Sequence, residues 1–313
     1  MSATTAYLAA EGYEAQLGAE LARAGVEVVR WHGRLAVTRA PAVAAAWAAN
    51  TWIDAEELAV ASIGDAARQL RARQRNWAEY APVHRGRARL IAERLPHVSA
   101  RPLTLGQPAP DAPLGSWTLL EPGLMLAAAG CTSAFPNGEV ALLEDRDGPP
   151  SRAYLKLWEA FVRLGRWPAS GDRCLDLGAS PGGWTWLLAT CGARVTAVDR
   201  AALAASVSEM AGVRERRGSA FALDPTTEQG WDWMVADIAC YPARLVGLVQ
   251  RWLDGAAAAN IVCTVKFQGE TDHDAADRLA RLAGARLFHL HHNRHELTLA
   301  ILADDRAAGP RPR

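Results

Sequence analysis

Two lysines and two carboxylates are the residues of this chain whose types and positions suit proton-transfer chemistry. Lys and Arg together number 34, but only Lys156 and Lys266 are lysines. A lysine can lose its proton when it is desolvated, whereas an arginine effectively cannot. Lys266 and Asp237 each end an apolar, strand-like segment. Lys156 lies in the helix-like segment SRAYLKLWEAF, and Glu296 begins the last apolar segment. These four groups can converge above one sheet, where a lysine can take the proton of a weak nucleophile such as a hydroxyl group.

A glycine-rich turn between a strand and a helix is the second feature that indicates a ligand. The strand-like RCLDL is followed by Gly178-Ala-Ser-Pro-Gly-Gly-Trp184, which opens a helix. Ligands of open α/β sheets bind beyond the carboxyl ends of the strands, and glycine lets the backbone approach them closely. Roughly 20 residues later Asp199 ends VTAVD, where its carboxylate can accept hydrogen bonds from a ribose diol. The turn lacks the G-x-G-x-x-G spacing, which disfavours a nicotinamide-dependent oxidoreductase. The alternative is a tight turn that binds nothing.

Strand-like and helix-like segments alternate from residue 151 almost to the end of the chain. Such alternation predicts an α/β fold, a Rossmann-like, mostly parallel sheet with helices on both faces. We expect the last two strands to pair, the final one antiparallel. The predicted helices are Ser151–Leu164, Gly183–Thr190, Pro242–Leu253 and Asp272–Leu282. The predicted strands are Arg173–Leu177, Ala193–Val198, Trp233–Ala236, Ile261–Val265, Leu287–Leu290 and Leu297–Leu302.

The first 145 residues predict a smaller α+β domain. Its expected elements are a strand over Ala6–Ala10, a helix over Tyr13–Arg23 and a hairpin over Glu27–Val37. Arginines far outnumber glutamates between Arg68 and Arg101, and Trp77 and Tyr80 lie among them. Arginines with interleaved aromatic side chains suit phosphate contact and base stacking, although a solvated helix face would carry the same charges.

The overall composition excludes several classes of protein. The net charge is zero, which excludes a chain that is basic throughout but not one with a local basic patch. We find no apolar run near the ~20 residues of a membrane helix and no signal-peptide pattern, and we expect a cytoplasmic protein. Five scattered cysteines without C-x-x-C indicate neither a disulfide framework nor a zinc site. The histidine-rich HLHHNRH could bind a metal, but nothing apart from Glu296 completes a zinc geometry, so we predict no metal site.

Residues of about 151–302 resemble the FtsJ-like RNA 2'-O-ribose methyltransferases. The segments that carry the resemblance are SRAYLKLWEAF, DLGASPGGWTW, AVD, DWMVAD, the strand end VKF and HNRHELTL. Within that family the chain is most similar to the RlmM-like group, which methylates a cytidine of 23S rRNA.

The resemblance implies a class I methyltransferase fold, S-adenosyl-L-methionine as the cofactor, and RNA as the partner. It implies that Lys266 is the proton acceptor and that Lys156, Asp237 and Glu296 complete a tetrad. The alternative is a set of separate salt bridges in an unrelated fold, but then the only two lysines would fill the two lysine positions by coincidence. The implied cofactor-binding residues are Gly178, Ser180, Pro181, Gly182, Gly183, Trp184, Asp199, Ser219 and Asp237. Relatives often carry an aspartate where this chain has Ser219, and Asp224 lies close to it in the sequence.

We therefore predict three parts. Residues 1–145 guide RNA through the Arg68–Arg101 segment, residues 146–303 are the methyltransferase domain, and residues 304–313 are a flexible tail. The RNA is expected to be large-subunit rRNA. Two alternatives remain open: a methyltransferase of a small molecule or a protein, which predicts no dependence on RNA, and a catalytically silent relative, which predicts RNA binding without methyl transfer.

Overall fold

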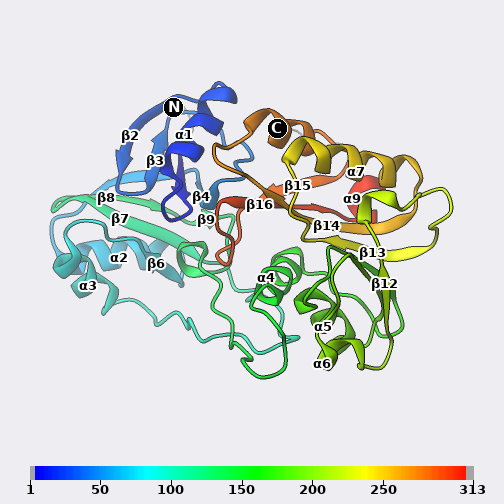
Figure 1. Ribbon diagram of the computed structural model, residues 1–313. Coiled ribbons are helices and arrows are strands. Elements are labelled where there is room, and N and C mark those ends of the chain that lie inside the picture. Colours follow the sequence, from blue (N-terminus) through cyan, green and yellow to red (C-terminus); the bar gives the residue numbers. More distant parts are fainter. Residues whose placement is uncertain (1–3, 308–313) are drawn as a thin grey trace. The chain divides into compact units, whose positions relative to one another are not determined.

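The computed structural model describes residues 4–307, which divide into two compact units (Figure 1). The first unit runs to Leu103 and includes Ala109–Ala141. The second unit comprises Thr104–Pro108 and the chain from Leu142 onward.

The first unit contains two sheets and three α-helices. Its five-stranded sheet has the order β2-β3-β1-β4-β9, and its four-stranded sheet has the order β5-β8-β7-β6. The predicted first strand, helix and hairpin correspond to β1, α1 and β2–β3. The elements of this unit are β1 (Thr5–Ala9), α1 (Glu14–Arg23), β2 (Val28–His32), β3 (Leu35–Thr38), β4 (Ala48–Ile53), β5 (Glu56–Ala59), α2 (Ile63–Arg73), β6 (Trp77–Glu79), α3 (Arg85–Ala92), β7 (Gly115–Glu121), β8 (Leu124–Ala128), β9 (Gly130–Cys131) and the 3-10 helix η1 (Pro136–Gly138).

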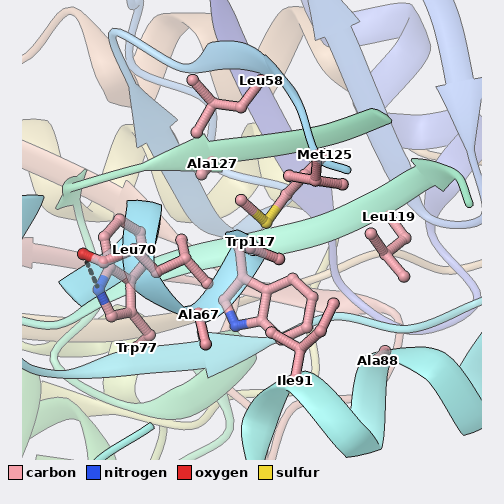
Figure 2. Packing of buried hydrophobic residues seen from close by; sticks show 12 residues of the cluster. Leu58, Ala67, Leu70, Trp77, Ala88, Ile91, Trp117, Leu119, Met125 and Ala127 are labelled. Atoms are coloured by element: carbon pink, nitrogen blue, oxygen red, sulfur yellow. Dashed lines mark hydrogen bonds between the residues drawn. The ribbon is translucent and has the colours of Figure 1, made fainter. Parts of the chain in front are cut away.

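Helices α2 and α3 cover the four-stranded sheet through a buried apolar cluster (Figure 2). Trp77 and Trp117 lie at its centre, and the indole Nε1 of Trp77 donates to the carbonyl of Leu70 at 3.1 Å. The interpretation of Trp77 as a base-stacking residue is therefore wrong, because its ring is 4% exposed and fills this core. Tyr80 is half-buried, and its hydroxyl accepts from the backbone N–H of Arg34.

The second unit is built on one seven-stranded sheet. Its elements are α4 (Tyr154–Leu164), β10 (Arg173–Leu177), α5 (Gly183–Thr190), β11 (Arg194–Asp199), α6 (Ala205–Ser208), β12 (Val213–Arg217), the 3-10 helix η2 (Ala220–Ala222), β13 (Trp231–Ala236), α7 (Pro242–Asp254), β14 (Ala258–Lys266), α8 (His273–Ala280), β15 (Ala285–Phe288), β16 (Glu296–Ile301) and α9 (Ala303–Ala307).

The strand order of this sheet creates one topological switch point. The order is β12-β11-β10-β13-β14-β16-β15, and all neighbouring strands are parallel except those that pair with β16. The chain winds from β10 toward β12 and then returns to β13 on the other side of β10, so the helices fall on opposite faces. Helices α5 and α6 lie on one face and α7 on the other (Figure 1). The predicted mostly parallel α/β sheet with an antiparallel final strand is confirmed. Ligands of such sheets bind at the switch point, here between the carboxyl ends of β10 and β13.

Two local features of the structure differ from what the sequence predicts. Strand β12 was not predicted, because its sequence VRERR is mostly exposed at the edge of the sheet and has no apolar run. Residues 303–307 form helix α9 and are not part of a flexible tail. This short helix is tied to the sheet because Asp305 is buried and pairs with Arg286 at 2.6 Å. The other residues of the predicted tail, 308–313, lie outside the described part of the chain. None of the helices between residues 4 and 307 has the length and apolarity that a membrane crossing requires.

Candidate active site

The four residues singled out from the sequence meet in one cluster at the carboxyl ends of β13 and β14. Lys156 Nζ lies 3.1 Å from Asp237 Oδ2 and 3.1 Å from Glu296 Oε1. Lys266 Nζ lies 2.8 Å from Asp237 Oδ1 and donates to the backbone carbonyl of Asp237 at 2.9 Å. We call this cluster the tetrad. Two lysine Nζ atoms thus face two carboxylates, and Asp237 contacts both lysines.

Three strands and a helix bring these side chains together. Lys266 ends β14 and pairs in register with Glu296, the first residue of the antiparallel neighbour β16. Asp237 directly follows β13, and its backbone N–H donates to the carbonyl of Leu177 at the end of β10. Lys156 enters from α4, an amphipathic helix that ends at Gly165 in the left-handed conformation. The position of each group therefore follows from where its strand or helix begins or ends.

Charge and burial in the tetrad act in opposite directions on Asp237. Burial raises the pKa of this carboxyl group, but the charges and hydrogen bonds of Lys156 and Lys266 lower it by a larger amount. The net pKa therefore lies below its ordinary value. The side chains of Lys156, Asp237 and Glu296 are only 13, 15 and 12% exposed, whereas that of Lys266 is 26% exposed. Lys266 is therefore the member of the tetrad that an incoming substrate can reach most easily.

Sequence reasoning missed a buried carboxylate that supports the tetrad. Glu159 is fully buried on α4, one helical turn after Lys156. It accepts hydrogen bonds from the backbone N–H groups of His291 and His292 at 2.8 and 3.0 Å, and it lies 2.7 Å from Arg163 Nη2 and 2.8 Å from His292 Nδ1. Burial raises the pKa of Glu159, but these partners lower it below its ordinary value. Glu159 thus anchors the segment that leads into Glu296. A carboxylate on the apolar face of SRAYLKLWEAF is the signal that could have revealed it.

The glycine-rich turn follows β10 as predicted, and its glycines are required by close packing. A Cβ atom on Gly183 would lie 2.6 Å from Ser151 Oγ, and one on Gly178 would lie 3.0 Å from Ile238 Cγ1. Gly182 directly precedes α5 and has a φ of +117°, a conformation that residues with side chains rarely adopt. Trp184 is buried, and its Nε1 donates to the carbonyl of Ala153 just before α4. The turn is thereby held against β13 on one side and the start of α4 on the other.

Asp199 stands at the end of β11 beside this turn. Its Oδ2 accepts from the backbone N–H of Ser180 at 3.1 Å, and its Oδ1 accepts from that of Ala201 at 2.8 Å. An ionised carboxylate has about four lone-pair sites, so two remain for the hydroxyl groups of a ribose. The residues at this edge therefore fit the nucleoside part of S-adenosylmethionine.

The positions near Ser219 are engaged in local turns. Ser219 caps η2, with its Oγ accepting from the N–H of Phe221. Asp224 is exposed, and its Oδ1 accepts from both the backbone N–H and the hydroxyl of Thr226. Asp224 therefore already hydrogen-bonds within its own turn. Of these two residues, Ser219 is closer in the sequence to the end of β12.

The histidine-rich segment belongs to the support of the tetrad. His292 pairs with Glu159, His289 Nε2 contacts the carbonyl of Arg294 at 3.0 Å, and His295 Nε2 contacts Thr271 Oγ1 at 2.8 Å. Burial lowers the pKa of His289 to about 4. Within residues 4–307, no group of three or more metal-ligating side chains converges.

Comparison with known proteins shows which family this chain resembles. Residues 149–282 match the family model of the FtsJ-like methyltransferases. The chain is 38% identical over 182 residues to ribosomal RNA large subunit methyltransferase M of Halorhodospira halophila, an alignment that covers 55% of this chain and 52% of the relative. It is 34% identical over 192 residues to the protein of the same name from Azotobacter vinelandii, covering 56% of this chain and 54% of the relative.

The chain spans about half the length of the curated relatives that it matches. The matched family segment contains the glycine-rich turn, Asp199, and three members of the tetrad, Lys156, Asp237 and Lys266. The expected resemblance is confirmed, and so is S-adenosylmethionine as the cofactor. Residues 149–282, which lie in the second unit, are thus similar to the FtsJ-like methyltransferases.

Proposed function

We propose that this chain transfers the methyl group of S-adenosylmethionine to a ribose 2'-hydroxyl group of large-subunit ribosomal RNA, in the RlmM-like manner on a cytidine. The observation that carries the proposal is the tetrad, in which two lysines and two carboxylates meet within 2.8–3.1 Å beside a turn suited to a nucleoside. Relatives named ribosomal RNA large subunit methyltransferase M support the choice of RNA. A cytoplasmic location is part of this proposal.

The chemistry requires a group that removes the hydroxyl proton. S-adenosylmethionine, when bound, supplies a methyl group attached to a sulfonium sulfur. That sulfur is the leaving group and becomes a neutral thioether. As the ribose oxygen forms its bond to carbon, Lys266 Nζ, in its neutral form, accepts the hydroxyl proton and becomes an ammonium ion. Asp237 orients Lys266 through its carboxylate at 2.8 Å and its carbonyl at 2.9 Å.

Lys156 and Glu296 have a different task in this mechanism. Lys156 contacts two carboxylates and balances their charge, while Lys266 contacts one. Glu296 completes the second contact of Lys156 and so fixes its side chain between α4 and β16. Gly178, Ser180, Pro181, Gly182, Gly183, Asp199 and Ser219 would hold the cofactor, with Trp184 supporting the turn.

The first unit is proposed to bind RNA through the exposed arginines of the segment 68–101. Arg68, Arg73 and Arg89 already pair with Asp65, Glu56 and Glu93. Arg75 and Arg101 are exposed and are better placed to meet phosphate groups.

Incorporation of a tritiated methyl group tests the proposal. The wild-type chain and Lys266→Ala are incubated side by side with labelled S-adenosylmethionine and total RNA from cells that lack the gene. We expect label in large-subunit RNA that withstands alkali, and none with Lys266→Ala. Cofactor binding without label in RNA or ribosomal particles, but with label in protein or small molecules, would overturn the RNA assignment.

A further inference from the structure

A hollow lined by arginines lies on the methyltransferase sheet, away from the tetrad. Its volume is ≈ 630 Å³. Four arginines and a single glutamate supply its charged lining: Arg173, Arg194, Arg214, Arg216 and Glu228. Arg194 begins β11, the strand that Asp199 ends, so the hollow starts roughly 17 Å from the cofactor edge at ~3.3 Å per residue.

The hollow exists because one face of the edge strands has no α-helix over it. On the other face, Val207 of α6 packs against Ala197 of β11 in a buried apolar cluster. The connection from β12 to β13 contains only the 3-10 helix η2 and no α-helix. At the amino ends of β10 and β11 the side chains on the opposite face are arginines, whereas Val198, farther along β11 on the same face, is buried.

Sheet register arranges the arginines in two directions. Arg173 pairs with Arg194 on the neighbouring strand, and Arg214 pairs with Thr196, two residues beyond Arg194. Paired residues of adjacent strands point to the same face, and residues i and i+2 lie roughly 6.6 Å apart along one strand. Arg214 and Arg216 are two residues apart on β12 and so lie on the same face. The cations thus repeat along a strand and across strands, which suits a chain of phosphates better than a single small anion.

Contacts with the protein orient three of the guanidinium groups without using all their donors. Arg173 Nη1 donates to the carbonyl of Gly230 at 3.0 Å while its guanidinium lies 4.8 Å from the centre of the Trp231 ring. Arg194 Nε donates to the carbonyl of Gly171 at 3.1 Å, and Arg216 pairs with Glu228. Each guanidinium has five N–H donors, so most of them remain for a ligand. Among residues 4–307, the guanidinium group of Arg214 has no hydrogen-bond or ion-pair partner.

We propose that this hollow binds the sugar–phosphate backbone of the substrate RNA at a position remote from the methylated ribose. The inference rests on the proposed function, since it adds a second contact for the same RNA. Trp231 is 8% exposed and lies beneath Arg173, so the hollow presents charge and not a stacking surface. It therefore contributes affinity that is independent of sequence and sensitive to salt. Only an RNA long enough to contact both the tetrad and this hollow gains affinity from it.

Equilibrium binding of two RNAs over a range of salt concentrations tests the inference. The probes are a fluorescent short hairpin around the methylated site and a long unmodified fragment of large-subunit rRNA. The test variant is Arg194→Gln with Arg214→Gln. The matched control is Arg278→Gln with Arg281→Gln, which removes two exposed arginines in and next to α8. For the long RNA we expect the slope of log K against log salt to flatten by about 1.4–1.8 in the test variant, at ~0.7–0.9 for each lost phosphate contact. Hairpin binding and the dissociation constant of S-adenosylmethionine should match those of the control.

Two results would overturn the inference while leaving the proposed function in place. One is a slope for the long RNA that equals that of the control variant. The other is an equal loss for the hairpin and the long RNA, which would place both arginines at the methylated end. Failure of the wild-type chain to bind either RNA would instead overturn the proposed function together with this inference.

Discussion

Replacement of Glu159 by glutamine tests how the tetrad is held in place. Glu159 is fully buried, and both of its oxygens accept from donors, including the guanidinium of Arg163 and the ring of His292. Glutamine keeps the shape but loses the charge, and it turns an N–H₂ group toward these donors. Disruption of a buried charged pair costs about 3–5 kcal/mol. At ~2–4 °C per kcal/mol for a domain of this size, the midpoint of thermal unfolding should fall by roughly 6–20 °C.

The pH dependence of this loss has a defined sign. The pKa of Glu159 is lowered in the folded protein, so its contribution is complete above the unfolded-state value of ~4.3 and disappears as the pH falls through the lower folded value. The difference between wild type and Glu159→Gln should therefore be full at neutral pH and shrink below about pH 4. Thermal melts followed by circular dichroism at several pH values measure it.

Glu209→Gln, which changes an exposed glutamate of the same unit, is the control for these melts. Methyl transfer below the unfolding temperature should also slow in Glu159→Gln, because the segment that leads into Glu296 loses its anchor. A midpoint equal to that of the control, or a difference that grows as the pH falls, would refute the reasoning.

Three further predictions concern the site and the core beneath it. Lys266→Arg keeps the charge but cannot readily give up a proton, so the folded protein should bind S-adenosylmethionine normally and turn over ~10²–10⁴-fold more slowly in single-turnover assays; a rate within tenfold of wild type would contradict this. Gly183→Ala places a Cβ atom 2.6 Å from Ser151 Oγ and should lower thermal stability and weaken cofactor binding by calorimetry, whereas Gly247→Ala, with open space around it in α7, should do neither. Burial raises the pKa of Asp176 to about 7, so charging it destabilises the fold as the pH rises from about 4 to about 7, and denaturant titrations should show Asp176→Asn gaining stability relative to wild type over that range; a constant difference would be evidence against it.

The residues of the tetrad were easier to predict from the sequence than the residues that hold the tetrad in place. Asp237 and Lys266 follow apolar strands whose carboxyl ends share one edge, so their convergence follows from the sheet alone. Glu159 was missed because two of its partners, His291 and His292, lie more than 130 residues away, and its place on the apolar face of SRAYLKLWEAF was the one local signal.

Parts of the fold escaped prediction for similar reasons. Strand β12 lies at the sheet edge with mostly exposed charged side chains, so it lacks an apolar signal. Trp77 lies in a sequence rich in arginines, which suggested base stacking, but its ring packs under α2 and α3. The pairings of β5 with β8 and of β6 with β7 join strands that are far apart in the chain, so they could not be predicted from local periodicity.

The central claim is that the tetrad directs methylation to a ribose hydroxyl with Lys266 as proton acceptor. The most direct measurement is mass spectrometry of nucleosides from unmodified large-subunit RNA after incubation with S-adenosylmethionine and either wild type or Lys266→Arg. The account predicts one 2'-O-methylated nucleoside, a cytidine, that forms with wild type and fails to form with the variant. A methyl group on a base, or equal formation of the 2'-O-methylated nucleoside by both proteins, would contradict it.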